Sequence, residues 1–203
     1  MRNGLRRIGI CLLAAVLIWF GGFLRDKQTL RDELIRLHVV GASDSQEDQQ
    51  MKLRLKDAVV ESLRNDMSKL ADAEEAKEYL QENLPKIESF ANDVLRKMGC
   101  EDSVRVSLGR EEFSTRVYDT FTLPAGVYEA LRITVGEGDG KNWWCVVFPG
   151  LCLPATADGF EDAAACAGFS DPLTAALEGE AGYEVRFFLL DVLGRVENFL
   201  HRE

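Results

Sequence analysis

The sequence has few of the side chains, and none of the motifs, on which common catalytic and metal sites depend. It contains only two histidines, His38 and His201, and no C-x-x-C pair, so a zinc site has little support. The G-x-S-x-G, H-E-x-x-H and P-loop motifs are also absent. We therefore expect no catalytic residues, no metal, no cofactor and no small-molecule substrate.

Basic residues are scarce outside the N-terminus. The chain of 203 residues carries 24 lysines and arginines against 34 acidic residues, a formal net charge of −10. Four of the basic residues lie in the first 25 positions, where no acidic residue occurs. The remainder is therefore strongly acidic and should be repelled by phosphate backbones. We expect no nucleic acid among the partners.

A long apolar run opens the chain. Behind the basic segment MRNGLRR, no charge occurs from Ile8 to Leu24, and Arg25 closes the run. The run is slightly long for the apolar core of a secretory signal, lacks a clean cleavage site, and is at the short limit for a membrane span. Basic residues favour a cytoplasmic N-terminus. We therefore expect residues 1–25 to be a signal peptide or a membrane anchor, and residues 26–203 to be an exported domain.

Export changes the interpretation of the cysteines. Cys145 and Cys152 bracket a Pro-Gly turn and are near enough in sequence to form a disulfide in an oxidising environment. Two buried thiols are the alternative, because cysteine is among the most buried residue types.

The first half of the exported part predicts a strand and a helix. Residues 34–40 alternate apolar and polar side chains, which is typical of a half-buried strand. The segment GASDS then ends the strand. Ser43, Asp44 or Ser45 can cap the helix that follows over residues 48–70.

Two later segments carry weaker helical signals. A second helical period ends at Gly99 and contains Pro85, where we expect a kink or a break, because proline lacks the backbone N–H and crowds the preceding turn. Residues 154–182 have weak periodicity and predict a loosely structured segment, in which Asp171 and Pro172 can begin a short helix.

Strand signals dominate elsewhere. Residues 104–108 and 127–135 alternate, whereas WWCVVF, residues 143–148, is apolar on both faces, which predicts a central strand paired with 127–135 in an antiparallel hairpin. Residues 184–191 predict a last strand that leads into a terminal helix. These patterns favour the α+β class: a single domain with a mostly antiparallel sheet packed against two long helices and a C-terminal helix, preceded by the apolar export or anchor segment.

The polar residues near the first strand allow functional and structural interpretations. Ser43, Asp44 and Ser45 could form a nucleophile cluster with His38, but Ser-Asp-Ser ahead of an amphipathic helix is typical of a helix cap. His38 is either a hydrogen-bonded histidine near the sheet or a partner-contacting, pH-sensing group. The basic helix edge that begins at Lys52 is either a solvated face or a contact for an acidic partner surface.

Two long blocks resemble the stage II sporulation protein R family of endospore-forming bacteria. They are LIRLHVVGASDSQEDQQMKLRLKDAVV, residues 34–60, and LPAGVYEALRITVGEGDGKNWWCVVFPGLC, residues 123–152. The pattern H-V-x(4)-D-S-x-x-D-Q, followed by G-K-N-W-W-C-V-x-F-P-x-L-C, is specific. The remainder, residues 154–203, adds little to the resemblance.

The resemblance implies a signalling protein rather than an enzyme. Members of the family are made in the forespore and exported into the space between two membranes. There they activate a membrane-embedded aspartic protease, which matures the precursor of a mother-cell sigma factor. An exported hydrolase with an unrecognised active site is the alternative.

The resemblance also identifies candidate residues. Trp143, Trp144 and the cysteines are expected to hold the fold. The polar residues that match the family pattern are candidate contacts with the protease: His38, Ser43, Asp44, Asp48, Gln49, Lys52, Arg132, Lys141 and Asn142.

Overall fold

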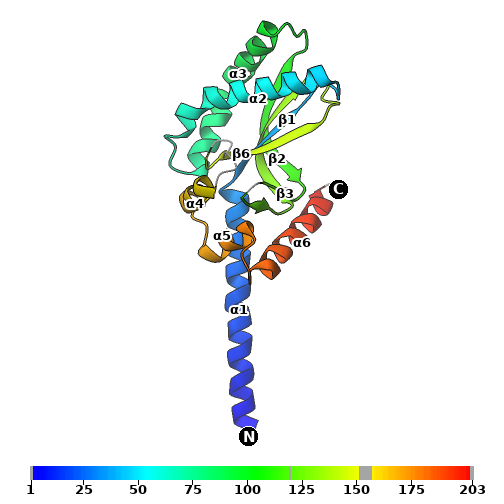
Figure 1. The fold of residues 1–203 in the computed structure, drawn as a ribbon. Helices are drawn as coiled ribbons and strands as arrows, with labels where there is room; N and C mark the ends of the chain where they lie inside the picture. Colours follow the sequence, from blue (N-terminus) through cyan, green and yellow to red (C-terminus); the bar gives the residue numbers. More distant parts are fainter. Residues whose placement is uncertain (1, 119, 151–156, 202–203) are drawn as a thin grey trace.

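A sheet with helices on both faces forms a single α+β domain, from which the N-terminal helix projects (Figure 1). This computed structural model describes residues 2–118, 120–150 and 157–201. The elements are, in chain order, α1 (Arg2–Asp32), β1 (Ile35–Val40), α2 (Gln46–Met67), α3 (Ala73–Lys97), β2 (Val104–Phe113), β3 (Arg116–Val117), β4 (Thr122–Leu123), β5 (Gly126–Val135), β6 (Asn142–Phe148), α4 (Ala157–Cys166), α5 (Asp171–Glu178) and α6 (Glu184–His201).

The central sheet is mixed and has the strand order β2-β5-β1-β6. β1 is parallel to β5 and antiparallel to β6, and β2 is antiparallel to β5. The predicted hairpin between β5 and β6 is therefore wrong, because β1 lies between these strands. β6 is an edge strand rather than a central one, although buried apolar side chains lie on both of its faces.

Helices α2 and α3 cover one face of the sheet (Figure 1). The Ser45 hydroxyl accepts the N–H of Asp48 at 3.1 Å, and the Asp72 carboxylate accepts the N–H of Glu75 at 2.9 Å. Each of these caps satisfies a backbone donor that has no partner inside its helix. The predicted cap and both long helices are confirmed. The core on this face includes Leu37, Val39, Leu55, Val59, Leu63, Leu80, Ala91, Leu95, Leu131 and Ile133.

The opposite face is covered by the second half of α1 and by α4, α5 and α6 (Figure 1). A second apolar cluster fills this space, and it is rich in aromatic rings. Phe121 stacks on Phe160 of α4 with a centroid distance of 4.2 Å. The buried members include Phe23, Leu30, Phe113, Tyr128, Val146, Phe160, Leu173 and Leu190.

The first half of α6 is the segment predicted as a last strand, and that prediction is wrong. A close approach fixes the helix: a Cβ on Gly194 would overlap the carbonyl oxygen of Ala125, in the turn before β5. The buried carboxylate of Asp191 accepts the N–H of Ala125 at 2.9 Å and the hydroxyl of Thr115, and pairs with Arg195 at 2.8 Å. Burial alone would raise the pKa of Asp191, but these three donors outweigh it and hold the pKa below its ordinary value.

Helix α1 joins the apolar N-terminal run to the domain without a break. The run itself is largely exposed, whereas Phe23, Asp26 and Leu30 are buried in the domain. The Asp26 carboxylate forms an ion pair with Arg186 of α6 and accepts the hydroxyl of Ser170 at 2.9 Å. α1 is long and apolar enough to cross a membrane, a property that a signal sequence shares.

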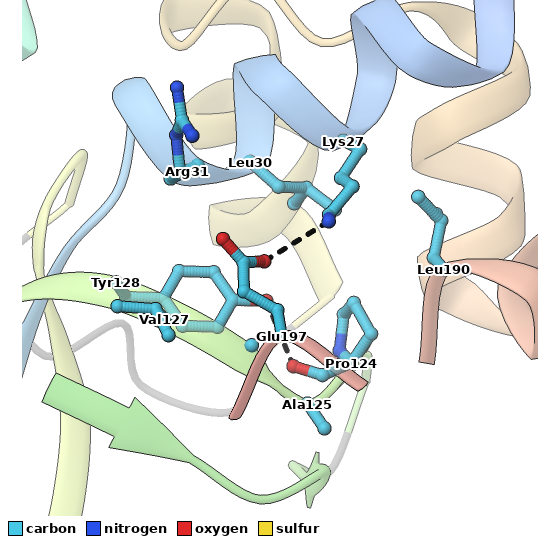
Figure 2. Close-up of a pocket in the computed structure, with 10 residues that line it drawn as sticks. Lys27, Leu30, Arg31, Pro124, Ala125, Val127, Tyr128, Leu190 and Glu197 are labelled. Atoms are coloured by element: carbon cyan, nitrogen blue, oxygen red, sulfur yellow. Dashed lines mark hydrogen bonds and ion pairs between the residues drawn. The ribbon is translucent and has the colours of Figure 1, made fainter. Parts of the chain in front are cut away.

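A small pocket lies where α1, α6 and the turn before β5 meet (Figure 2). Lys27 Nζ lies 3.1 Å from Glu197 Oε2 across it, and the Tyr128 hydroxyl donates to the Pro124 carbonyl at 2.8 Å. The space is too small for a ligand larger than water. The junction is therefore a packed joint between the two helices.

Two further expectations differ from the structure. α3 is continuous past Pro85, so the expected break does not occur. Proline cannot donate to the carbonyl of Gln81, one turn earlier, but both residues are exposed, so water can bond to that carbonyl instead. Within residues 154–182, which were expected to be loosely structured, the described part contains α4 and α5. The short helix expected at Asp171 and Pro172 is confirmed as α5, with Ser170 as its cap.

Candidate functional site

Two loops meet at the end of the sheet where β1 and β5 end and β6 begins. The first follows β1 and leads into α2, and the second connects β5 to β6. The N–H of Gly140 donates to the carbonyl of Gly41 at 2.9 Å, and a Cβ on Gly140 would overlap the carbonyl group of Ser43. We call this contact, between residues 41–52 and residues 136–142, the loop joint.

Predicted site residues supply most of the hydrogen bonds of the loop joint. The Ser43 hydroxyl donates to the Asp48 carboxylate, and the Gln49 amide donates to the Ser43 carbonyl at 2.7 Å. The Asp44 carboxylate accepts the backbone N–H of Lys141 at 2.7 Å. Asp44, a predicted partner contact, therefore also joins the two loops, and the other two bonds fix the shape of the first loop.

Lys52 is the buried centre of the loop joint, with 4% of its surface exposed. Its ammonium group donates to the Lys141 carbonyl at 2.8 Å and to the Gln49 side-chain oxygen at 2.6 Å. Burial lowers the pKa of Lys52, and the nearby carboxylate of Asp44 partly opposes this. The interpretation of Lys52 as part of a solvated face is therefore wrong.

The loop joint does not assemble the nucleophile cluster considered from the sequence. The Ser43 hydroxyl is engaged by Asp48, Ser45 caps α2, and the His38 ring bonds to Glu111 on β2. Among the residues that the structure describes, no group of three or more His, Cys, Asp or Glu side chains is placed to hold a metal ion. The polar side chains of the loop joint thus form hydrogen bonds. Of the predicted partner contacts in the joint, those exposed to solvent are Asp44, Lys141 and Asn142.

The other two predicted contacts, His38 and Arg132, belong to a separate cluster on the sheet face opposite α2 and α3. His38 Nδ1 lies 2.6 Å from Glu111 Oε2, and Arg132 Nη1 lies 3.3 Å from Glu111 Oε1. The His38 ring stacks on Trp144 at 5.7 Å, and the Arg116 guanidinium lies 3.4 Å from the centre of the Trp144 indole. His38 is buried with 8% of its surface exposed, so the hydrogen-bonded histidine near the sheet is the arrangement observed. Its role as a partner contact stays a prediction.

Glu111, which no sequence pattern marks, should make stability depend on pH. Burial alone would raise its pKa, but the hydrogen bonds and charges of His38 and Arg132 hold the pKa below its ordinary value. A carboxylate with a lowered folded-state pKa stabilises the protein above its unfolded-state pKa, and this contribution disappears as the pH falls through the folded-state value.

We therefore expect Glu111→Gln to be less stable than the wild type at neutral pH, with a difference that shrinks in acid. Urea unfolding of both proteins between neutral and acidic pH measures this difference. Glu101→Gln, at an exposed loop position, is the control. A difference between wild type and Glu111→Gln that stays constant with pH would contradict the expectation.

Arg36 is a fully buried cation on the same sheet face, with no measurable exposure. Its guanidinium lies 4.1 Å from the centre of the Phe113 ring and 5.1 Å from that of Tyr128, and Nη2 donates to the Tyr118 hydroxyl at 2.8 Å. No described residue accepts a hydrogen bond from Nε or Nη1. The half-buried strand expected here is thus buried on both faces, and the aromatic rings provide part of the stabilisation that water would give the charge.

Tyr118→Phe should therefore lower the free energy of unfolding by about 1.5–3 kcal/mol, because it removes the only hydrogen-bond acceptor that the described residues offer Arg36. Chemical denaturation measures the loss. Tyr183→Phe is the control, since the half-buried Tyr183 hydroxyl forms no hydrogen bond to any described residue. Equal stability of Tyr118→Phe and the wild type would show that the aromatic rings alone stabilise the buried charge of Arg36.

The two tryptophans of β6 point to opposite faces of the sheet. Trp143 packs against the core beneath α2, with the Lys56 ammonium 4.7 Å from its ring centre, and Trp144 contacts the second cluster. Cys145 is buried: it pairs with Leu37 of β1, and its side chain lies in the core on the face covered by α2 and α3. Cys152 lies outside the described residues, so the disulfide between Cys145 and Cys152 stays a prediction.

The chain is similar to a known sporulation protein. Stage II sporulation protein R of Bacillus subtilis (strain 168) is 40% identical over 122 residues, which cover 60% of this chain and 54% of that protein. The match therefore spans about half the length of this curated relative. No solved structure matches the chain.

The family model of stage II sporulation protein R matches residues 31–158. The matched range contains all four strands of the central sheet, both loops of the loop joint, and the cluster around His38 and Arg36. It excludes the apolar run and α5 and α6. The chain belongs to the stage II sporulation protein R family and has a role in sporulation.

Proposed function

We propose that this protein is an exported signal that activates a membrane-embedded aspartic protease of the sporulating cell. Activation leads to maturation of a mother-cell sigma-factor precursor. The protein acts from the space between the forespore and mother-cell membranes, and it contributes a binding surface rather than a catalytic group.

The observation that carries this proposal is the family match over residues 31–158. The matched region follows directly on an apolar helix that is suited to export or anchoring, as an exported signal requires. The matched region also contains the loop joint, whose backbone is held by hydrogen bonds that include those of the buried Lys52. A surface fixed in this way loses little conformational entropy on binding, which favours recognition of a partner.

Reconstitution in a non-sporulating bacterial host tests the proposal. The host would produce this protein, the protease and the sigma-factor precursor, and precursor cleavage would be scored by mass. A variant without residues 2–20 should stay in the cytoplasm and leave the precursor intact, while it keeps Phe23 and the buried part of α1. Cleavage that is equally efficient without this protein, or with the cytoplasmic variant, would contradict the proposal.

The exposed side chains of the loop joint are the proposed contact. Lys141→Met and Asn142→Ala should each reduce precursor cleavage, by about thirtyfold if the side chain contributes the ~2 kcal/mol of an interface hot spot. Both side chains are exposed, so neither change should alter stability. Lys97→Met, at an exposed position near the end of α3, is the matched control. Full cleavage with both variants would place the contact elsewhere on the protein.

A further inference from the structure

Helix α6 has apolar side chains on two opposite faces. One face packs on the domain through Leu190, Asp191 and Gly194. The other carries a row of large apolar side chains spaced three or four residues apart, which places them on one side of the helix. We call this row the α6 stripe; its members and their exposed fractions are Val185 65%, Phe188 62%, Val192 37%, Val196 49% and Phe199 68%.

The α6 stripe differs from the other exposed apolar side chains of the domain. Outside α1 and α6, the large exposed apolar residues in the described part are isolated on different elements: Leu53, Phe90 and Val117. Single exposed apolar residues are normal, whereas a continuous row marks a surface that another molecule or a membrane covers. We therefore expect another molecule or a membrane to cover the α6 stripe.

The position of α6 beside α1 indicates that occupant. In Figure 1, α6 lies on the side of the domain from which α1 emerges, with α2 and α3 at the far end. The start of α6 lies at the level where the apolar run ends: Arg186 pairs with Asp26, and its Nη2 would be 3.8 Å from a Cβ on Gly22. The stripe thus begins where the exposed apolar surface of α1 meets the domain.

We propose that the α6 stripe lies on the surface of the lipid bilayer in which α1 is anchored. This inference rests on the proposed function and takes residues 1–25 to be a membrane anchor rather than a cleaved signal peptide. The stripe points away from the domain on the membrane side, so α6 contacts the interface with the acyl chains, at a depth of about 5–10 Å, as interfacial helices do.

The α6 axis is inclined to α1 (Figure 1). A tilt of α1 in the bilayer allows α1 to cross the membrane while α6 lies along the membrane surface. Membrane-spanning helices tilt by about 20° on average, and by as much as about 40°. A tilt of α1 toward α6 lowers the stripe onto the membrane. Because the domain is acidic, apolar contact rather than attraction to anionic headgroups must provide the affinity.

Photocrosslinking of the full chain in phosphatidylcholine vesicles tests this inference. The photoreactive residue p-benzoylphenylalanine would replace Phe188 or Phe199 in the stripe, Phe20 in the apolar run, or Phe90 on α3. Phe90 is the matched control, since it is also an exposed phenylalanine on a helix but belongs to α3, which covers the sheet face opposite α6. After irradiation, mass spectrometry detects the gain of one phospholipid.

We expect lipid adducts at Phe20, Phe188 and Phe199 and none at Phe90. Adducts at Phe20 without adducts at Phe188 and Phe199 would overturn the inference and leave the anchor in place. Crosslinks from Phe188 or Phe199 to a second copy of the chain would overturn it in favour of a dimer. The absence of lipid adducts even at Phe20 would instead contradict the proposed anchoring of α1.

Discussion

Replacing Gly194 by alanine is expected to detach α6 and to lower the free energy of unfolding by about 1–3 kcal/mol, or more if the turn before β5 cannot move. The new methyl group would overlap the carbonyl oxygen of Ala125, which is backbone and cannot rotate away. Helix propensity favours alanine over glycine by about 1 kcal/mol, so a net loss of stability would show that the close approach dominates. Loss of the fit would also weaken the bonds from Ala125 and Thr115 to Asp191.

Urea unfolding of the full chain in detergent micelles, with limited proteolysis of α6 in the folded protein, measures this effect. The matched control is Gly21→Ala in α1, another helical glycine, around which no atom lies within 4 Å of the new Cβ. Gly21→Ala should leave the protease resistance of α6 unchanged and should not lower the stability, because helix propensity favours alanine there. Equal stability and protease resistance of Gly194→Ala and the wild type would mean that α6 is not fixed at this point.

Lys52→Met should be the second strongly destabilising change, with a loss of about 1–3 kcal/mol. Methionine has a similar length but cannot donate to the carbonyl of Lys141 or to the side chain of Gln49, which leaves acceptors without their donor at a nearly buried site. The two loops should then separate. The same variant should lower precursor cleavage, because the exposed side chains of Lys141 and Asn142 lose their fixed positions.

Lys141→Met separates the structural effect from the contact itself. Its ammonium group is lost from an exposed side chain, while the backbone groups that bond to Asp44 and Lys52 remain. Chemical denaturation of both variants, together with the cleavage assay, should give a loss of stability only for Lys52→Met. Similar stability losses for the two lysines would contradict the buried role of Lys52.

The sequence predicted those elements whose formation is local. A serine cap and a regular apolar period were sufficient to place α2, and alternation located β1 and β5. Residues 184–191 were assigned to the wrong element because a helix with apolar side chains on two opposite faces has no clean helical period in a short segment. Pro85 was misleading because its effect depends on whether the freed carbonyl faces water, which only the packing decides.

The order of the strands could not be predicted from local patterns. Neighbouring strands in sequence favour a hairpin, yet β1 inserts between β5 and β6, and this insertion depends on burial of both faces of β1. The candidate site had the same difficulty. The family pattern identified Ser43, Asp44, Asp48, Gln49 and Lys52. Only the structure shows that Asp44 and Lys52 bond to the second loop, whereas Ser43, Asp48 and Gln49 bond within the first.

The place of β1 in the sheet also sets the order in which the domain can fold. Ile35 pairs with Glu129 on one side and with Phe148 on the other, so the sheet is complete only when the chain up to the end of β6 is available. Pairings so distant in sequence form slowly, because a long loop must close before they give any stabilisation. If the domain is exported as proposed, this slow pairing should favour translocation of an unfolded chain, which then completes its sheet on the far side of the membrane.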